Sequence, residues 1–97
     1  MASVYIIYSK KLNRFYTGSC LDFEERLRLH NSGYYSKSYT SKTDDWTVHI
    51  LISDLEYEQA RSIERHIKEM KSRKYILNLA KYPEIVDKLI VGFRAGS

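Results

Sequence analysis

The stretch FYTGSCLDFEERLRLH, residues 15–30, contains the change from strand to helix on which the predicted fold depends. Its first residues are aromatic and β-branched, as is typical of a strand, and Gly18 interrupts them. Asp22 followed three residues later by Glu25 resembles a capping box, so we expect a helix that continues to about Asn31 and Gly33. The sequence therefore predicts a short strand that leads into a capped helix.

Two further strands are expected on either side of this stretch. Residues 3–9, SVYIIYS, are rich in β-branched and aromatic side chains, and the polar residues 10–13 that follow are typical of a turn. We therefore expect an antiparallel hairpin that places Tyr5 and Tyr16 on neighbouring strands. Residues 46–53, WTVHILIS, combine alternation with β-branching and predict the third strand.

Helices are expected over the second half of the chain. Ser53 with Glu56 matches a second capping box and predicts a long helix through about Lys71. Its apolar stripe comprises Ala60, Ile63, Ile67 and Met70. Residues 74–92 predict a short turn or helix and then a last helix over about 83–91, with Pro83 in its first turn and Gly92 beyond its end.

These elements predict an α+β fold: a three-stranded antiparallel sheet flanked by helices, in the order β-β-α-β-α-α. A chain of 97 residues is large enough for one core and too small for two, so residues 1–97 are expected to form a single domain. The core is expected over about residues 3–80.

Composition narrows the class of protein. The chain has no long apolar run, its N-terminus lacks the basic start and cleavage site of a signal peptide, and its single cysteine, Cys20, cannot form an internal disulfide. We therefore expect a cytoplasmic protein without a membrane span. A net charge of +4 and a pI near 9.2 favour an anionic partner, with nucleic acid as the first candidate.

Two stretches carry much of the positive charge. Residues 60–81 hold seven Lys or Arg, and residues 34–43 mix three tyrosines with Lys37 and Lys42 and contain no acid. Cations interleaved with aromatic side chains suit a phosphate backbone and exposed bases. A solvated helix face and a polar loop explain each stretch, taken alone, equally well.

Three charged or titratable residues fall at the borders of the predicted apolar faces. Arg26 and His30 lie one turn apart on the first helix, and Glu64 lies beside the stripe of the long helix. A structural interpretation is available for each: a packed histidine, an arginine stem over apolar surface, and a salt bridge from Glu64 to Arg61, Arg65 or Lys68. Their combination with two neighbouring tyrosines favours a functional site.

This set of residues resembles the GIY-YIG nucleases. Residues 3–5, Ser-Val-Tyr, and residues 16–18, Tyr-Thr-Gly, correspond to the two triplets of that family. An arginine follows the second glycine by eight residues, as Arg26 does, and a tyrosine or histidine follows one turn later. The positions that match the family's functional residues are Tyr5, Tyr16, Arg26, His30, Glu64 and Asn78. The resemblance covers about residues 3–80.

The resemblance implies a metal-dependent DNA endonuclease of the small standalone branch, similar to the N-terminal domain of excision-repair nucleases. Two positions depart from the pattern. Ser3 replaces the first glycine, and Ser19 stands where excision-repair members carry a lysine that contacts phosphate. Lys37 or Lys42 is expected to supply that contact.

The resemblance also implies a role for each matched residue. Glu64 is expected to hold one Mg²⁺ or Mn²⁺, and Arg26 to bind a phosphate oxygen. Tyr5, Tyr16 and His30 are three alternatives for the general base, and sequence does not choose among them. Asn78 is expected to be a supporting hydrogen-bond partner.

The predicted function is hydrolysis of phosphodiester bonds in DNA, with RNA as a possible further substrate. Because no separate recognition domain is expected, cleavage should be structure-selective or weakly sequence-specific, or should take its specificity from a protein partner. One alternative is a non-catalytic nucleic-acid-binding module with the same fold. A second is a protein-interaction domain in which these residues only pack.

Overall fold

The computed structural model describes residues 1–33 and 39–94. In these ranges the strands are β1 (Ala2–Ser9), β2 (Arg14–Cys20) and β3 (Thr47–Leu55). The helices are α1 (Phe23–Asn31), a 3₁₀ turn η1 (Tyr39–Lys42), α2 (Tyr57–Met70), α3 (Arg73–Lys81) and α4 (Pro83–Gly92). The strands form an antiparallel sheet in the order β2-β1-β3, which confirms the predicted α+β fold. Within the described ranges, three α-helices follow β3 where the predicted order has two, because residues 73–81 form a full helix.

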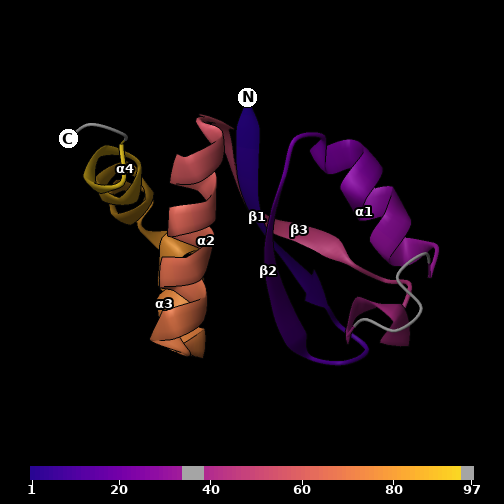
Figure 1. The fold of residues 1–97 in the computed structure, drawn as a ribbon. Helices are drawn as coiled ribbons and strands as arrows, with labels where there is room; N and C mark the ends of the chain where they lie inside the picture. The colour runs from indigo at the N-terminus through magenta and orange to yellow at the C-terminus, as the bar shows by residue number, and fades with distance from the viewer. Residues whose placement is uncertain (34–38, 95–97) are drawn as a thin grey trace.

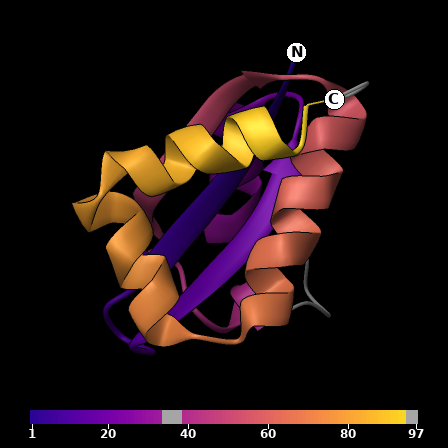
Figure 2. The same ribbon diagram turned by 90° about the vertical axis from the view of Figure 1, so that its left-hand side faces the viewer.

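The sheet separates two layers of helix (Figure 1). Alternate residues of β1 point to opposite faces: Val4 and Ile6 pack with α2, α3 and α4, while Tyr5 and Ile7 pack toward α1. All four side chains are buried because β1 is the central strand. α4 runs across the helical layer and ends near the beginning of α2 (Figure 2), where Gln59 donates a hydrogen bond to the Ile90 carbonyl. No helix in the described ranges is long and apolar enough to cross a membrane.

The beginning of each predicted helix can be compared with the structure. Asp22 caps α1 by accepting a hydrogen bond from the Glu25 N–H, as expected, although the Glu25 side chain pairs with Arg28 and does not complete a capping box. The predicted capping box from Ser53 to Glu56 is wrong. β3 continues through Leu55, which is buried and pairs with Ala2, and α2 is capped instead by a box between Glu56 and Gln59. Burial of Leu55 in the core therefore outweighs the local capping pattern.

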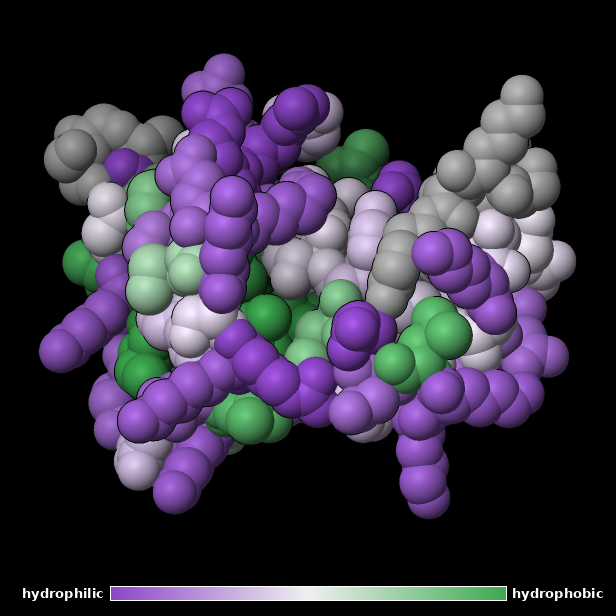
Figure 3. Space-filling view, turned by 90° about the horizontal axis from the view of Figure 1, so that it is seen from below, coloured by the Kyte–Doolittle hydropathy of each residue, from purple (hydrophilic) through white to green (hydrophobic). Residues whose placement is uncertain are grey.

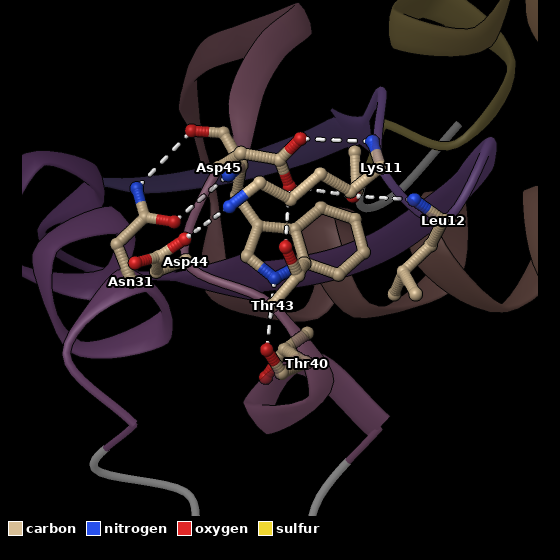
Figure 4. Close-up of polar contacts among 9 residues, drawn as sticks. Lys11, Leu12, Asn31, Thr40, Thr43, Asp44 and Asp45 are labelled. Carbon is tan, nitrogen blue, oxygen red and sulfur yellow. Dashed lines mark hydrogen bonds and ion pairs between the residues drawn. The ribbon is translucent and has the colours of Figure 1, made fainter.

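The β1–β2 turn is tied to the segment before β3 through Asp45. The Ser9 hydroxyl donates to Asp45 at 2.5 Å, the Thr43 hydroxyl at 2.7 Å and the Lys11 backbone N–H at 2.9 Å. Figure 4 shows this carboxylate between the turn and the loop. These three hydrogen bonds hold the pKa of Asp45 well below its ordinary value. They fix the hairpin against the loop that precedes β3.

The same loop is anchored to α1 through Trp46. Asn31 accepts a hydrogen bond from the Trp46 N–H at 2.8 Å and donates to its carbonyl at 3.1 Å (Figure 4). The buried indole N–H of Trp46 donates to the carbonyl of Thr40 at 2.9 Å. These bonds hold Thr40 against the end of α1, where it meets His30.

Candidate active site

Tyr5, His30 and Thr40 form a buried hydrogen-bonded chain on the α1 face of the sheet. The Tyr5 hydroxyl lies 2.9 Å from His30 Nε2, and His30 Nδ1 lies 2.7 Å from the Thr40 hydroxyl. Tyr5 is 1% exposed and His30 4% exposed, so neither ring faces open solvent. Each imidazole nitrogen thus has a hydroxyl partner, an arrangement that suits a neutral ring with one donor and one acceptor.

Gly18 makes room for the Tyr5 ring. The two residues are partners across β1 and β2, and a Cβ added to Gly18 would lie 2.4 Å from the Tyr5 hydroxyl oxygen. Any side chain at this position would therefore push the ring away from His30. The glycine of the second triplet has a structural reason here: the tyrosine of the first triplet lies directly over it.

Burial determines the protonation states of Tyr5 and His30. Desolvation, and then the neighbouring Tyr16, raise the pKa of Tyr5 far above its ordinary value, and the Arg26 guanidinium offsets only part of this rise. Desolvation and the Arg26 charge lower the pKa of His30 to about 4. At neutral pH we therefore expect a protonated phenol beside a neutral imidazole.

We expect the folded state to lose stability as the pH falls from 6.5 toward about 4 because of His30. The unfolded chain takes up a proton near pH 6.5, while the folded chain resists protonation until about pH 4. The contribution of His30 is therefore complete above pH 6.5, is lost on acidification, and amounts to about 3 kcal/mol. Urea unfolding between pH 7 and pH 4 measures it, and the part of the pH dependence that comes from His30 should be absent in His30→Phe. An equal slope in both proteins would contradict the assignment.

Glu64 lies on the other face of β2, on the side covered by α2. The Ser19 hydroxyl donates to Glu64 Oε1 at 2.5 Å, and Lys68, one turn later on α2, forms an ion pair with Oε2 at 2.6 Å. The Glu64 side chain is 20% exposed. Burial by itself raises the pKa of Glu64, but the hydrogen bonds from Lys68 and Ser19 together outweigh it, and the net pKa is below the ordinary value. Glu64 is therefore a partly exposed, ionised carboxylate.

Glu64 and Arg26 line one hollow at the edge of the sheet, although they come from helices on opposite faces. We call it the edge hollow. Its lining consists of Ala2, Ser19, Cys20, Leu21, Arg26, Tyr57, Ala60, Arg61 and Glu64. The hollow can join the two faces because β2 is an edge strand, so its open side is not covered by another strand. A carboxylate and two guanidinium groups thus meet where a ligand can enter.

Tyr16 connects the two faces at the same edge. Its ring lies 5.3 Å from the His30 ring and 6.4 Å from the Trp46 ring, and the Lys68 ammonium lies 5.9 Å from its centre on the other side. Tyr16 is half-buried, whereas Tyr5 is fully buried. Of the two predicted tyrosines, Tyr16 is therefore the more exposed, although it is not among the residues that line the edge hollow.

The donor set fits a metal ion that keeps most of its water. Within residues 1–33 and 39–94, no group of three or more His, Cys, Asp or Glu side chains could enclose an ion. The Glu64 carboxylate has about four acceptor positions, of which Ser19 and Lys68 use two. A single carboxylate with free lone pairs suits Mg²⁺ or Mn²⁺, which takes its other ligands from water and substrate. It does not suit a structural zinc site.

Two other predicted residues, Asn78 and Lys42, lie apart from the edge hollow. Asn78 is on α3, which packs against β3 and α4, and it is not among the residues that line the hollow. Lys42 is at the end of η1 and lines a different hollow with Lys11 and Asp44. Lys37 lies outside the described residues.

Sequence reasoning missed two participants in these contacts, Ser19 and Thr40, and left Lys68 as one of three alternatives. In the sequence, Ser19 stands out only as the position where excision-repair nucleases carry a lysine. In the structure its hydroxyl donates a hydrogen bond directly to Glu64. Lys68 was one of three possible ion-pair partners of Glu64, and the i, i+4 spacing is the signal that would have selected it. Thr40 carries no signal in the sequence because loop geometry alone places it beside His30.

A known family of catalytic domains matches most of the chain. The family model described as the GIY-YIG catalytic domain matches residues 1–76, which include β1, β2, α1, β3 and α2 with Tyr5, Tyr16, Arg26, His30 and Glu64. No curated protein and no solved structure matches the chain. The matched range covers more than half of the 97 residues. The chain therefore belongs to the GIY-YIG family of nuclease catalytic domains.

Proposed function

We propose that this protein is a divalent-metal-dependent endonuclease that hydrolyses phosphodiester bonds in DNA at the edge hollow. The observation that carries the proposal is that Glu64 and Arg26 line the same hollow from opposite faces of the sheet. Phosphodiester hydrolysis needs charge neutralisation at the phosphoryl oxygens and an activated water molecule. The edge hollow offers a carboxylate for a metal ion and guanidinium groups for phosphate oxygens.

Glu64 is the proposed metal-binding residue. A divalent cation bound there would neutralise charge on the scissile phosphate and make a bound water molecule more acidic. The Ser19 hydroxyl holds Oε1 of Glu64 and so orients the carboxylate toward the hollow. Lys68 forms an ion pair with Oε2 of Glu64 and supplies a positive charge beside the proposed phosphate site.

Arg26 is the proposed phosphate clamp. Its guanidinium carries five N–H donors in a planar fork, which matches two oxygens of a phosphate group. It lines the edge hollow with Glu64, and its charge also acts on Tyr5 and His30. Arg26 is thereby placed to stabilise charge that grows on the phosphoryl oxygens in the transition state.

Tyr16 is the proposed partner of the attacking water molecule. Its ring is half-buried at the edge of the sheet, and Lys68 lies over it on the side of Glu64. Tyr5 and His30 are buried behind it and act as positioning residues, since their rings pack within 6.5 Å and 5.3 Å of the Tyr16 ring. A neutral His30 Nε2 can also hold the Tyr5 hydroxyl proton in place.

The substrate is proposed to be DNA that is selected by structure or with weak sequence preference. The cations at the edge hollow, Arg26 and Arg61, suit phosphate oxygens, and contacts to phosphates carry no base information directly. A bend, branch or flap would then decide where the strand reaches Glu64.

The experiment that tests the proposal is a cleavage assay on end-labelled duplex, branched, flapped and single-stranded DNA, with an RNA of the same sequence. Each substrate is incubated with Mg²⁺, with Mn²⁺ and with chelator. We expect cleavage of at least one DNA structure with either metal and none with chelator. Binding without cleavage on every substrate would instead support a non-catalytic nucleic-acid-binding module.

A further inference from the structure

A second groove lies between β2, the last turn of α2 and the beginning of α3. We call it the junction groove. Its lining consists of Arg14, Phe15, Thr17, Ile67, Lys68, Lys71, Ser72, Arg73 and Ile76. Lys68 and Lys71 also line a shallow hollow that contains Glu64, so the surface between Glu64 and the junction groove is continuous. Glu64 and Lys68 lie one turn apart on α2, and Lys71, which follows the last residue of that helix, lines the same shallow hollow.

The junction groove carries four cations, Arg14, Lys68, Lys71 and Arg73, and its lining contains no acid. Among the described residues, Lys68 is the one member of these four that forms an ion pair. Figure 3 views this end of the molecule and shows hydrophilic side chains crowded over the helices, around smaller hydrophobic patches. Such a surface suits a polyanion.

Lys71 occupies a backbone conformation that glycine would adopt at lower cost. It follows the last turn of α2 with φ 47° and ψ 39°, which is the left-handed region. Helices commonly end with glycine in this conformation because a Cβ is strained there. A lysine at this position therefore gives up stability and adds a charge at the mouth of the groove. Strain of this kind is associated with functional sites.

Arg73 is held in a fixed orientation at the opposite wall of the groove. Its guanidinium donates to the Asn13 carbonyl at 3.2 Å and to Asn13 Oδ1 at 2.7 Å, and it lies 5.0 Å from the centre of the Phe15 ring. These contacts use two of its five N–H donors. As the first residue of α3 it also lies at the positive end of a helix dipole, where cations are disfavoured unless an anion binds.

We propose, on the basis of the proposed function, that the junction groove binds the phosphate backbone of the substrate strand on one side of the bond that is cut. Lys71 lies two helical turns from Glu64, or about 10 Å along the axis. A strand carries one phosphate for about every 3.4 Å of duplex axis and winds around that axis, so a groove at this distance lies within a few nucleotides of the scissile bond. Lys71, Arg14 and Arg73 therefore contact phosphates within a few nucleotides of the scissile one.

The test uses the full chain in chelator, so that binding is measured without cleavage. Anisotropy of a fluorescent DNA duplex and of its single strand is recorded over about 50–200 mM NaCl for wild type, Lys71→Gly, Lys71→Asn and Arg14→Gln/Lys71→Gly. Lys88→Gln, which removes one exposed charge on α4, is the control with matched net charge. Glycine and asparagine both tolerate the left-handed conformation, so both variants are expected to fold.

We expect Lys71→Gly to weaken binding about 3–10-fold and to reduce the slope of log K against log salt by about 1. The double variant should lose about 10–100-fold and a slope of about 2. The melting temperature of Lys71→Gly should rise by roughly 2–6 °C, because the strain at this position is relieved. Lys88→Gln should bind as wild type does.

Equal binding of Lys71→Gly and Lys88→Gln would overturn the assignment of the groove, and so would a wild type that binds neither form of DNA. A cleavage assay in Mg²⁺ separates the two proposals. If wild type cleaves DNA but the groove variants bind DNA as wild type does, the junction-groove proposal is rejected and the nuclease proposal is retained. If the groove variants show the expected losses of binding but wild type does not cleave DNA, the junction groove is retained as a nucleic-acid-binding surface and the nuclease proposal is rejected.

Discussion

We expect Glu64→Gln to lower the rate of DNA cleavage by about 10³-fold or more at saturating metal. The substitution keeps the size of the side chain and removes the negative charge that would bind the cation. The amide can still accept a hydrogen bond from Ser19, so the geometry of the edge hollow is retained. Single-turnover cleavage of end-labelled DNA measures the loss.

The fold should survive this substitution. Glu64 is not part of either hydrophobic core, and its ion-pair partner Lys68 is half-exposed, so the pair contributes little to stability. We expect a change of less than about 1 kcal/mol in the free energy of unfolding. Loss of activity with an unchanged melting temperature separates catalysis from packing.

Glu84→Gln is the matched control for Glu64→Gln. Glu84 is an exposed carboxylate in the first turn of α4, and it is absent from the lining of the edge hollow, of the shallow hollow that contains Glu64 and of the junction groove. Its substitution should leave cleavage within about two-fold of wild type. Equal activity of all three proteins would remove Glu64 from the mechanism, and a large loss of stability in Glu64→Gln would favour a structural role.

Gly18→Ala should destabilise the protein by about 2–4 kcal/mol. The added methyl would lie 2.4 Å from the Tyr5 hydroxyl oxygen and 2.5 Å from the ring carbon that carries it. The ring cannot easily move, because it packs against Phe23 at 5.2 Å and is hydrogen-bonded to His30. The substitution should therefore break the bond from Tyr5 to His30 as well as lower stability. Urea unfolding and the histidine ring signals in NMR spectra measure the two effects.

Gly92→Ala provides the comparison for Gly18→Ala. Gly92 is the last residue of α4, and a Cβ there would meet no atom within 4 Å in the described structure. Alanine is favoured over glycine in a helix, so this variant should be as stable as wild type or more stable. If Gly18→Ala were as stable as Gly92→Ala, close packing of Tyr5 over the glycine would not describe the protein in solution.

Local sequence patterns were sufficient to predict the sheet and the main helices. The two triplets lie in strands whose alternation is clear, Asp22 caps α1 directly, and Ala60, Ile63 and Ile67 are the buried stripe of α2. Met70, the fourth expected member of the stripe, is 43% exposed because it lies in the last turn. Periodicity identifies the inner face of a helix but not the residue at which the face leaves the core.

The parts that sequence did not predict depend on contacts between distant segments. Ser53 matched a capping pattern, but the burial of Leu55 keeps the chain in β3 for two more residues. Thr40 meets His30 only because Trp46 and Asn31 hold the loop in place. These contacts depend on tertiary geometry and have no local sequence signature.

The division of the site around β2 was also not apparent from the sequence. Tyr5, Tyr16 and His30 lie on the α1 face and Glu64 lies on the α2 face, while Arg26 extends from α1 into the edge hollow that Glu64 also lines. Neighbouring residues of β2 alternate between the faces of the sheet. Gly18 therefore leaves room for the Tyr5 ring on one face, while Ser19 donates a hydrogen bond to Glu64 on the other. One five-residue strand segment, residues 16–20, thereby supports both halves of the site.

The most direct test of a metal centre at Glu64 is the single-turnover cleavage rate of wild type, measured on one DNA substrate as Mg²⁺ is raised from zero in chelator. A metal-dependent centre at Glu64 predicts no cleavage in chelator, a rate that rises and saturates with Mg²⁺, and no such rise for Glu64→Gln. Cleavage that persists undiminished in chelator, or a metal response that is the same in Glu64→Gln, would show that Glu64 does not hold a catalytic metal ion.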